Sequence, residues 1–111
     1  MENCIFCKII KGDIPSKKVY EDDLLYAFYD IQPAAPTHVL IIPKEHICCM
    51  KEAKPEHEAL LGHILLTAQK IAKDLGLTSY RIINNCGEEA GQTVFHLHFH
   101  LLGGDKFTNL V

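Results

Sequence analysis

The sequence has no apolar stretch long enough to span a lipid bilayer, and its first residues, Met1 to Cys4, lack the basic region and apolar run of an export signal. Basic residues are few as well: 11 Lys and Arg stand against 14 Asp and Glu, for a formal charge of −3, and no polybasic stripe occurs. These absences argue against a membrane or a nucleic acid as partner. We expect a cytoplasmic protein, and any phosphate that it binds should belong to a small molecule.

Internal repeats, low-complexity segments and linkers are also missing. The 111 residues, 48% of them hydrophobic, suffice for one domain over 1–111 with a modest core. A chain of this length leaves roughly a third of its unfolded-state surface exposed after folding. Pairing with a second copy would bury more of it, so we expect a homodimer.

The cysteines number five, an odd count, and without an export signal they indicate thiols or metal ligands rather than a disulfide framework. Cys4 and Cys7 have the Cys-x-x-Cys spacing of half a tetrahedral metal site, although a redox pair or two core thiols can share that spacing. Cys48, Cys49 and Cys86 lie in mixed surroundings, and we expect them to be small buried side chains of the core.

Apolar residues at helical spacing predict two helices. The first covers two turns near residues 4–11 and ends at Gly12. The second carries a continuous apolar face over residues 55–75, and Gly76 is placed to terminate it in the left-handed conformation.

Short runs of β-branched, aromatic and apolar residues between turn signals predict strands over 19–21, 24–29, 38–42, 80–84 and 94–102. Strands grouped by hairpins, with helices segregated from them, indicate an α+β fold. We expect a largely antiparallel five-stranded sheet with a short N-terminal helix and one long helix.

The last predicted strand alternates polar and apolar residues strictly, so His96, His98 and His100 should project from one exposed face about 6.6 Å apart in succession. A solvated face normally carries a mixture of polar residues rather than three histidines. A three-histidine metal site would require neighbouring side chains to converge on one ion at about 2.1 Å. Nucleophilic catalysis fits better, because a neutral imidazole attacks phosphorus and is then a good leaving group. The glycine-bearing loop 87–93 could hold phosphate oxygens, but an ordinary turn explains it equally well.

The segment 96–102 has the form His-x-His-x-His-x-x and resembles the histidine triad superfamily. The similarity covers nearly the whole chain and points to the histidine triad nucleotide-binding protein branch, in its bacterial type with an N-terminal Cys-x-x-Cys. The other segments that carry it are 4–10, 26–31, 35–38, 42–46, 91–93 and 103–104.

The resemblance implies a catalytic role for each of four residues. His98 would be the nucleophile and His100 would bind the α-phosphate. His38 would support the site by hydrogen bonding, and Thr93, where family members usually have serine, would help to protonate the leaving group.

The resemblance also implies a nucleotide site in which Asp30 holds the ribose hydroxyls. Without the resemblance, the sequence would indicate that Asp30 is a turn residue and that Phe6, Phe28 and Ile31 belong to the core. The remaining nucleotide contacts that it implies are Ile5, Phe6, Phe28, Tyr29 and Ile31 around the purine, with Asn85, Gly91 and Gln92 beside Thr93, His98 and His100.

For the cysteine pair, the resemblance implies a structural zinc ion held by Cys4, Cys7, His46 and His96. The competing interpretation assigns His46 and His96 to a proton relay with the nucleophile. We favour zinc because both cysteines are present, and the chemistry itself would need no metal.

The function implied is that of a purine nucleotide phosphoramidase or nucleotidyl hydrolase. It would act at the α-phosphate of AMP or GMP derivatives through a covalent nucleotidyl-histidine intermediate and release nucleoside monophosphate. The alternatives are a dinucleoside polyphosphate hydrolase, a nucleotide-sensing or partner-binding module with incidental catalysis, and a zinc-dependent structural protein.

Overall fold

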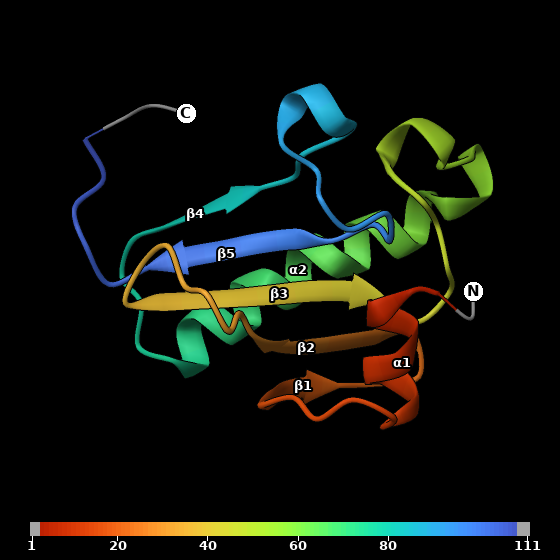
Figure 1. Ribbon diagram of the computed structural model, residues 1–111. Helices are drawn as coiled ribbons and strands as arrows, with labels where there is room; N and C mark the ends of the chain where they lie inside the picture. Colours follow the sequence, from red (N-terminus) through yellow and green to blue (C-terminus); the bar gives the residue numbers. More distant parts are fainter. Residues whose placement is uncertain (1–2, 109–111) are drawn as a thin grey trace.

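The computed structural model describes residues 3–108 and has the expected α+β fold (Figure 1). Its sheet has the strand order β1-β2-β3-β5-β4, and all neighbouring strands are antiparallel. Within this part of the chain, no helix is long and apolar enough to cross a membrane. The elements in chain order are α1 (Ile5–Lys11), β1 (Lys18–Glu21), β2 (Leu25–Tyr29), β3 (Thr37–Pro43), the 3₁₀ helices η1 (Met50–Glu52) and η2 (Pro55–His57), α2 (Glu58–Asp74), β4 (Tyr80–Ile83), the 3₁₀ helix η3 (Glu88–Ala90) and β5 (Phe99–Gly103).

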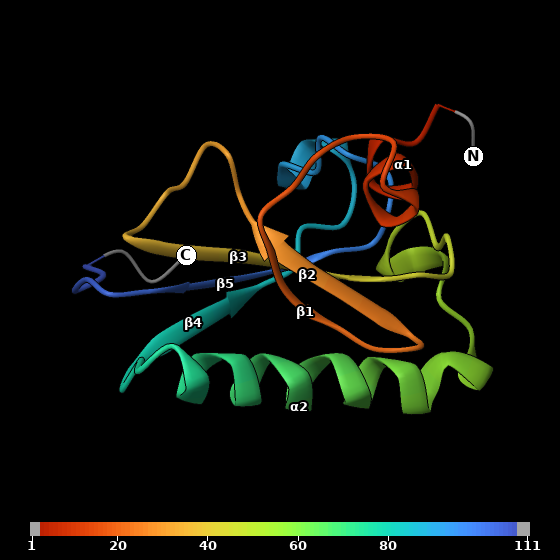
Figure 2. The same cartoon turned by 90° about the horizontal axis from the view of Figure 1, so that it is seen from below.

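The two helices lie on opposite faces of the sheet, and β3 is buried between them (Figure 2). Val39 and Ile41 point into the cluster that includes the buried side of α2. Leu40 and Ile42 point into the cluster that includes Phe6 of α1. Because both faces of β3 are covered, its sequence is a continuous apolar run rather than an alternating one.

The long helix ends as the sequence predicts. Gly76 has φ 75°, and its N–H donates to the carbonyl of Lys73 at 3.1 Å. The N–H of Leu77 donates to the carbonyl of Ala72 at 2.9 Å, which closes the glycine-terminated turn. At its start, the predicted helix is divided into the short η2 and α2, which begins at Glu58.

The last strand is shorter than predicted, since β5 begins at Phe99 and leaves His96 and His98 in the segment before it. The register pairs Ile41 with Phe99, which would place Pro43 opposite residue 97. Proline has no N–H to donate, so the ladder cannot continue there. The N–H of residue 97 donates instead to the carbonyl of Ile47 at 2.6 Å. The same segment therefore leaves the sheet and approaches the loop that follows β3.

Candidate functional site

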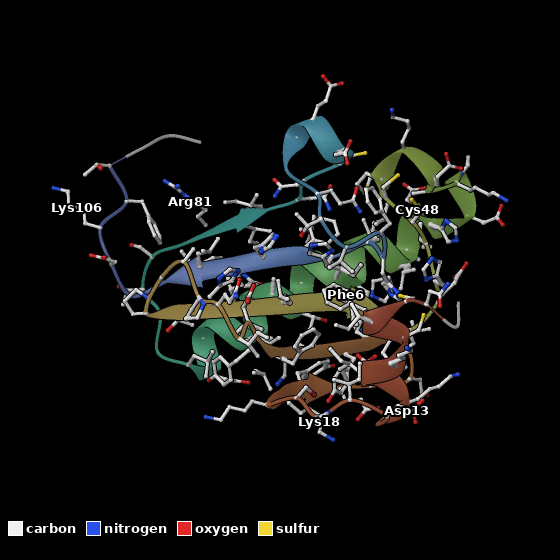
Figure 3. All side chains as sticks on the ribbon, viewed as in Figure 1. Phe6, Asp13, Lys18, Cys48, Arg81 and Lys106 are labelled. Atoms are coloured by element: carbon white, nitrogen blue, oxygen red, sulfur yellow. The ribbon has the colours of Figure 1, made fainter. Side chains whose placement is uncertain are left out.

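The histidines of the triad lie under α1, and the prediction that all three share an exposed face is wrong. His96 has no exposed surface and His98 is only 7% exposed, whereas His100 is half-buried. Phe6 of α1 sets its ring edge-on against His98, with centroids 5.1 Å apart, and lies over the sheet in Figure 3. The alternation of the sequence reports which side of the chain a residue faces but not what covers that side.

His98 is held in a single tautomer by the backbone. Its Nδ1 lies 2.7 Å from the carbonyl oxygen of His96, which can only accept a hydrogen bond. Nδ1 therefore carries the proton, and Nε2 keeps its lone pair. Burial lowers the pKa of His98 and favours the neutral ring. The arrangement produces an imidazole whose free nitrogen is ready to attack an electrophile.

His100 is oriented through His38 by a chain of hydrogen bonds. The N–H of Ala34 donates to Nδ1 of His38 at 3.0 Å, so a neutral His38 carries its proton on Nε2. That nitrogen lies 2.9 Å from Nδ1 of His100 and 3.5 Å from the carboxylate of Asp30. His38 thus donates to His100, whose own proton is then on Nε2. His100 is set as a hydrogen-bond donor, complementary to the lone pair of His98.

Burial lowers the pKa of His38 and lowers that of His100 to about 4. Positive charge on His98 or His38 would lower the pKa of His100 further, while Asp30 opposes the shift. Both rings are therefore neutral near pH 7, and the assignment of protons above holds there.

A cavity of about 320 Å³ opens in front of His98 and His100. Most of the nucleotide contacts implied by the sequence line it, and the hydroxyl-bearing Thr93 does so as well. His38 does not line it but hydrogen-bonds to His100, which does. The predicted residues that line the cavity are Ile5, Phe6, Phe28, Tyr29, Asp30, Ile31, Thr93, His98 and His100.

Three other predicted contacts, Asn85, Gly91 and Gln92, are not among the residues that line this cavity. The side chain of Gln92 is engaged elsewhere and is only 2% exposed. Its amide nitrogen donates to the carbonyls of Cys48 and Val94, and its oxygen accepts from the N–H of Gly87. In this structure Gln92 holds the loop before the triad together.

The sequence analysis missed several residues of the cavity wall. Leu40 is one, and its pairing with His100 in the sheet register places it on the same face. Ser16 is another, and its hydroxyl is 2.7 Å from that of Tyr26. Strand register would have identified Leu40, but the sequence does not specify register. The other missed wall residues are Ile9, Ile14, Pro15, Gln32 and Val94.

Cys4, Cys7, His46 and His96 come together between α1 and the segment before β5, with all four ligand atoms within 4.8 Å of one another. The sulfurs of Cys4 and Cys7 lie 3.3 and 3.6 Å from Nδ1 of His96, and the Cys7 sulfur lies 3.4 Å from Nδ1 of His46. Ligands around a tetrahedral zinc ion stand about 3.6 Å apart, given bonds of 2.0 to 2.3 Å. The donor set therefore fits zinc in both chemistry and spacing.

The protonation of His96 supports this fit. Its Nε2 lies 2.8 Å from the carbonyl oxygen of Pro43 and must donate to it, so Nδ1 presents a lone pair to the two sulfurs. Burial raises the pKa of the Cys7 thiol, and its hydrogen bond and charge interaction with Cys4 raise it further. A cation would relieve the repulsion between two thiolates at this position.

The other three cysteines correct a prediction. Cys49 is buried, but Cys48 and Cys86 are half-buried on loops rather than packed into the core.

Comparison with known proteins assigns this geometry to a family. The HIT domain matches residues 11–107. The chain belongs to the HIT family. It is 50% identical to the purine nucleoside phosphoramidase of Escherichia coli strain K12 over 105 residues, which cover 93% of this chain and 88% of that protein. The solved structure of a HIT family hydrolase from Clostridium thermocellum is 54% identical, with a TM-score of 0.95. The match covers 100% of this chain and 99% of that one.

A zinc-bound histidine triad family protein from Mycobacterium smegmatis is 32% identical, with a TM-score of 0.83, and the match covers 99% of this chain and 81% of that one. Together, the HIT domain and these relatives support a hydrolase.

Because His100 is neutral in the folded protein, we expect the free energy of unfolding to depend on pH. Its pKa is about 4 when folded and near 6.5 when unfolded, so the unfolded chain binds more protons between these values. The free energy of unfolding should therefore fall as pH decreases from 6.5 toward 4. Replacing His100→Gln should reduce that slope, as measured by urea unfolding at pH 7, 6 and 5. Equal slopes in the two proteins would show that His100 does not titrate in this window.

Proposed function

We propose that this protein hydrolyses the bond between the α-phosphate of a purine nucleotide and its leaving group, through a covalent nucleotidyl-His98 intermediate. The observation that carries the proposal is the pair of fixed tautomers at the cavity. One histidine offers a lone pair and its neighbour offers an N–H. That is the combination needed to attack phosphorus and to stabilise the charge that develops on its oxygens.

In the first step, Nε2 of His98 forms a bond to phosphorus, and the bond from phosphorus to the leaving group breaks. The N–H at Nε2 of His100 donates to a phosphate oxygen. The hydroxyl of Thr93, which lines the same cavity, is positioned to donate a proton toward the departing amine. In the second step, water attacks phosphorus, the bond to Nε2 breaks, and nucleoside monophosphate is released. A P–N bond suits this route because a protonated amine leaves readily.

The remaining cavity wall supports a nucleoside. Phe6 and Phe28 meet edge to face at 5.5 Å and provide an apolar surface, together with Ile5 and Ile31. Ile31 is 92% exposed, an unusual position for a large apolar side chain unless a ligand covers it. Asp30 brings a carboxylate to the same cavity for the ribose hydroxyls. The similarity to a purine nucleoside phosphoramidase supports a purine.

We also propose that Cys4, Cys7, His46 and His96 hold a structural zinc ion. The ion would link α1 to the segment that carries His98 and would take no part in the reaction. The competing proton relay is less well supported. Nδ1 of His96 faces the sulfur of Cys4, and its Nε2–H donates a hydrogen bond to the carbonyl oxygen of Pro43. The hydrogen bond that joins His96 to His98 runs through the backbone carbonyl of His96, not through its ring.

A homodimer remains part of the proposal. The outer strand β4 exposes Tyr80 and Ile82, and α2 exposes Leu65 and Leu66, with Leu66 at 67% exposure. A second copy could cover these apolar side chains and pair with the free edge of β4. The acidic net charge agrees with a cytoplasmic protein that acts on small nucleotides rather than on nucleic acids or membranes.

The test compares two substrates that share an adenylate. Adenosine 5′-phosphoramidate should be hydrolysed with a kcat/KM at least about 100-fold above that of diadenosine tetraphosphate. A cavity of about 320 Å³ is at the small end of ligand sites and suits one nucleotide. Cytidine 5′-phosphoramidate serves as the control for base preference. The reverse order would favour a dinucleoside polyphosphate hydrolase, and tight AMP binding without turnover of either would favour a nucleotide-sensing module.

A further inference from the structure

The cavity in front of the histidines extends across the sheet, away from the triad. His100 of β5 pairs with Leu40 of β3, and Leu40 pairs with Phe28 of β2, so the three residues form a row across neighbouring strands (Figure 1). Neighbouring strands lie about 4.8 Å apart, which places the backbone of Phe28 about 10 Å from that of His100. All three residues line the cavity, so the cavity follows this row.

Ser16 lies at the far end of the row. The N–H of Tyr29 donates to the carbonyl of Lys17 at 3.0 Å, so the segment before β1 runs along the side of β2 that faces away from β3. Ser16 lines the cavity from this segment. Its hydroxyl is 2.7 Å from that of Tyr26, which is buried in the same apolar cluster as Phe28. Ser16 therefore stands beyond Phe28, at the end of the cavity opposite the histidines.

The cavity wall around Ser16 is apolar. Ile14 and Pro15 precede it in the chain and line the cavity with it, and Ile9 and Phe28 complete this part of the wall. A flat aromatic base fits against such a surface, but the polar groups on its ring edge lose their contact with water when the base is buried. The hydroxyl of Ser16 is in position to replace that contact.

The placement of a nucleotide along this row rests on the proposed function. With the α-phosphate at the two histidines and the ribose at Asp30, the base extends toward Phe28 and Ser16. The part of a purine farthest from the ribose is the edge formed by N1 and the group on C6. A pyrimidine is shorter by one ring and would end before it reaches Ser16.

Adenine and guanine carry opposite hydrogen-bonding groups on this edge. Adenine has a donor on C6 and an acceptor at N1, whereas guanine has an acceptor on C6 and a donor at N1. A hydroxyl suits either pattern, because it can both donate and accept. When Tyr26 donates to Ser16, the hydrogen of Ser16 is free to donate to the base. When Ser16 donates to Tyr26, a lone pair of Ser16 is free to accept from the base.

We propose that Ser16 is a specificity-determining residue that hydrogen-bonds the N1 and C6 edge of a purine, either as donor or as acceptor. Tyr26 positions the hydroxyl, and the hydrogen bond between the two residues reverses its direction to suit the base. The site then binds adenine and guanine alike and discriminates against pyrimidines. Ser16 stands at the opposite end of the cavity from His98 and takes no part in the reaction.

Binding of nucleoside monophosphates to the full-length, zinc-supplemented protein tests this role, with wild type and Ser16→Ala compared by calorimetry. AMP and GMP are products of the proposed reaction and bind without turnover. In Ser16→Ala, we expect the Kd of both to rise by about 3- to 10-fold, the usual effect of one hydrogen bond. Ser79→Ala, which removes an exposed hydroxyl between α2 and β4, is the matched control and should bind as the wild type does.

Two further nucleotides separate a contact with the base from a structural role of the Ser16 hydroxyl. Benzimidazole riboside 5′-monophosphate has the shape of a purine nucleotide but no hydrogen-bonding group on its six-membered ring. Its Kd should be the same for wild type and Ser16→Ala. CMP should bind more weakly than AMP and should be equally insensitive to the substitution. A cavity that was merely loosened would weaken the binding of all four nucleotides together.

The role of Ser16 is overturned if Ser16→Ala weakens all four nucleotides alike, if it weakens none, or if it weakens AMP but not GMP or the reverse. Circular dichroism establishes that the variant is folded. Purine nucleotides that bind as expected without any turnover of the phosphoramidate would contradict the proposed hydrolysis and leave this result intact. Normal turnover with unchanged affinities in Ser16→Ala would contradict only the role of Ser16.

Discussion

Turnover of adenosine 5′-phosphoramidate should fall by at least about 10³-fold in the variant His98→Asn, because the nitrogen that attacks phosphorus is removed. Asparagine is chosen because its amide nitrogen can replace Nδ1 and keep the hydrogen bond to the carbonyl of His96. AMP should still bind within a few-fold of the wild-type affinity, since the cavity wall is unchanged. Steady-state release of AMP and calorimetric binding measure the two quantities separately.

Mass spectrometry tests directly for the proposed covalent intermediate. Acid-quenched wild-type protein should carry an adduct with the mass of AMP less one water on a peptide that contains His98, and His98→Asn should carry none. His63→Asn is the matched control. His63 lies on α2, on the face of the sheet opposite α1 (Figure 2), and pairs with Asp22. Substantial turnover by His98→Asn, or an adduct on another residue, would remove His98 as the nucleophile.

The sequence could predict many of the residues that the structure brings together at this site because the signals are local. Cys4 and Cys7 share a helical turn, and the alternation at 96–100 places three histidines on the same side of the chain. The apolar run of β3 predicted a buried strand, and the glycine after α2 predicted its end. Each of these signals depends on neighbours within a few residues.

What the sequence could not predict depends on contacts between distant segments. The tautomer of His100 is set by the N–H of Ala34 through His38, and that of His96 is set by the carbonyl of Pro43. The early end of β5 also traces to Pro43, which lies opposite the triad segment only because of the sheet register. Neither hydrogen-bond direction nor register is encoded in a local pattern.

The same limit explains the misplaced cysteines. Their surroundings in the sequence predicted core residues, whereas Cys48 and Cys86 are half-buried on loops, and only Cys49 is buried. It also applies to Gln92, whose hydrogen bonds to Cys48 and Val94 hold the loop before the triad and could not be foreseen from its neighbours in the sequence.

Removal of the proposed zinc ion should lower the stability of the protein more than any single change in the cavity in front of His98 and His100. The cluster joins the start of α1 to His96, two residues before the proposed nucleophile, so the ion would hold Phe6 against His98. A metal that binds only the folded state, at a free concentration about 1000 times its Kd, adds about 4 kcal/mol. For a chain of this size, that corresponds to a decrease in Tm of about 15 °C or more when the ion is removed.

Cys7→Ser and His46→Ala should each lose the ion and show this decrease, whereas Cys48→Ser, which changes a thiol outside the cluster, should retain both zinc and Tm. Elemental analysis should find about one zinc per wild-type chain. A chelator should lower the Tm of the wild type to that of Cys7→Ser and should leave the Tm of Cys7→Ser unchanged. The relay interpretation predicts a different pattern. His46→Ala would reduce turnover, and a chelator would change neither the metal content nor the Tm of the wild type. Since His96 directs Nδ1 toward two sulfurs and donates Nε2–H to Pro43, we expect the first pattern.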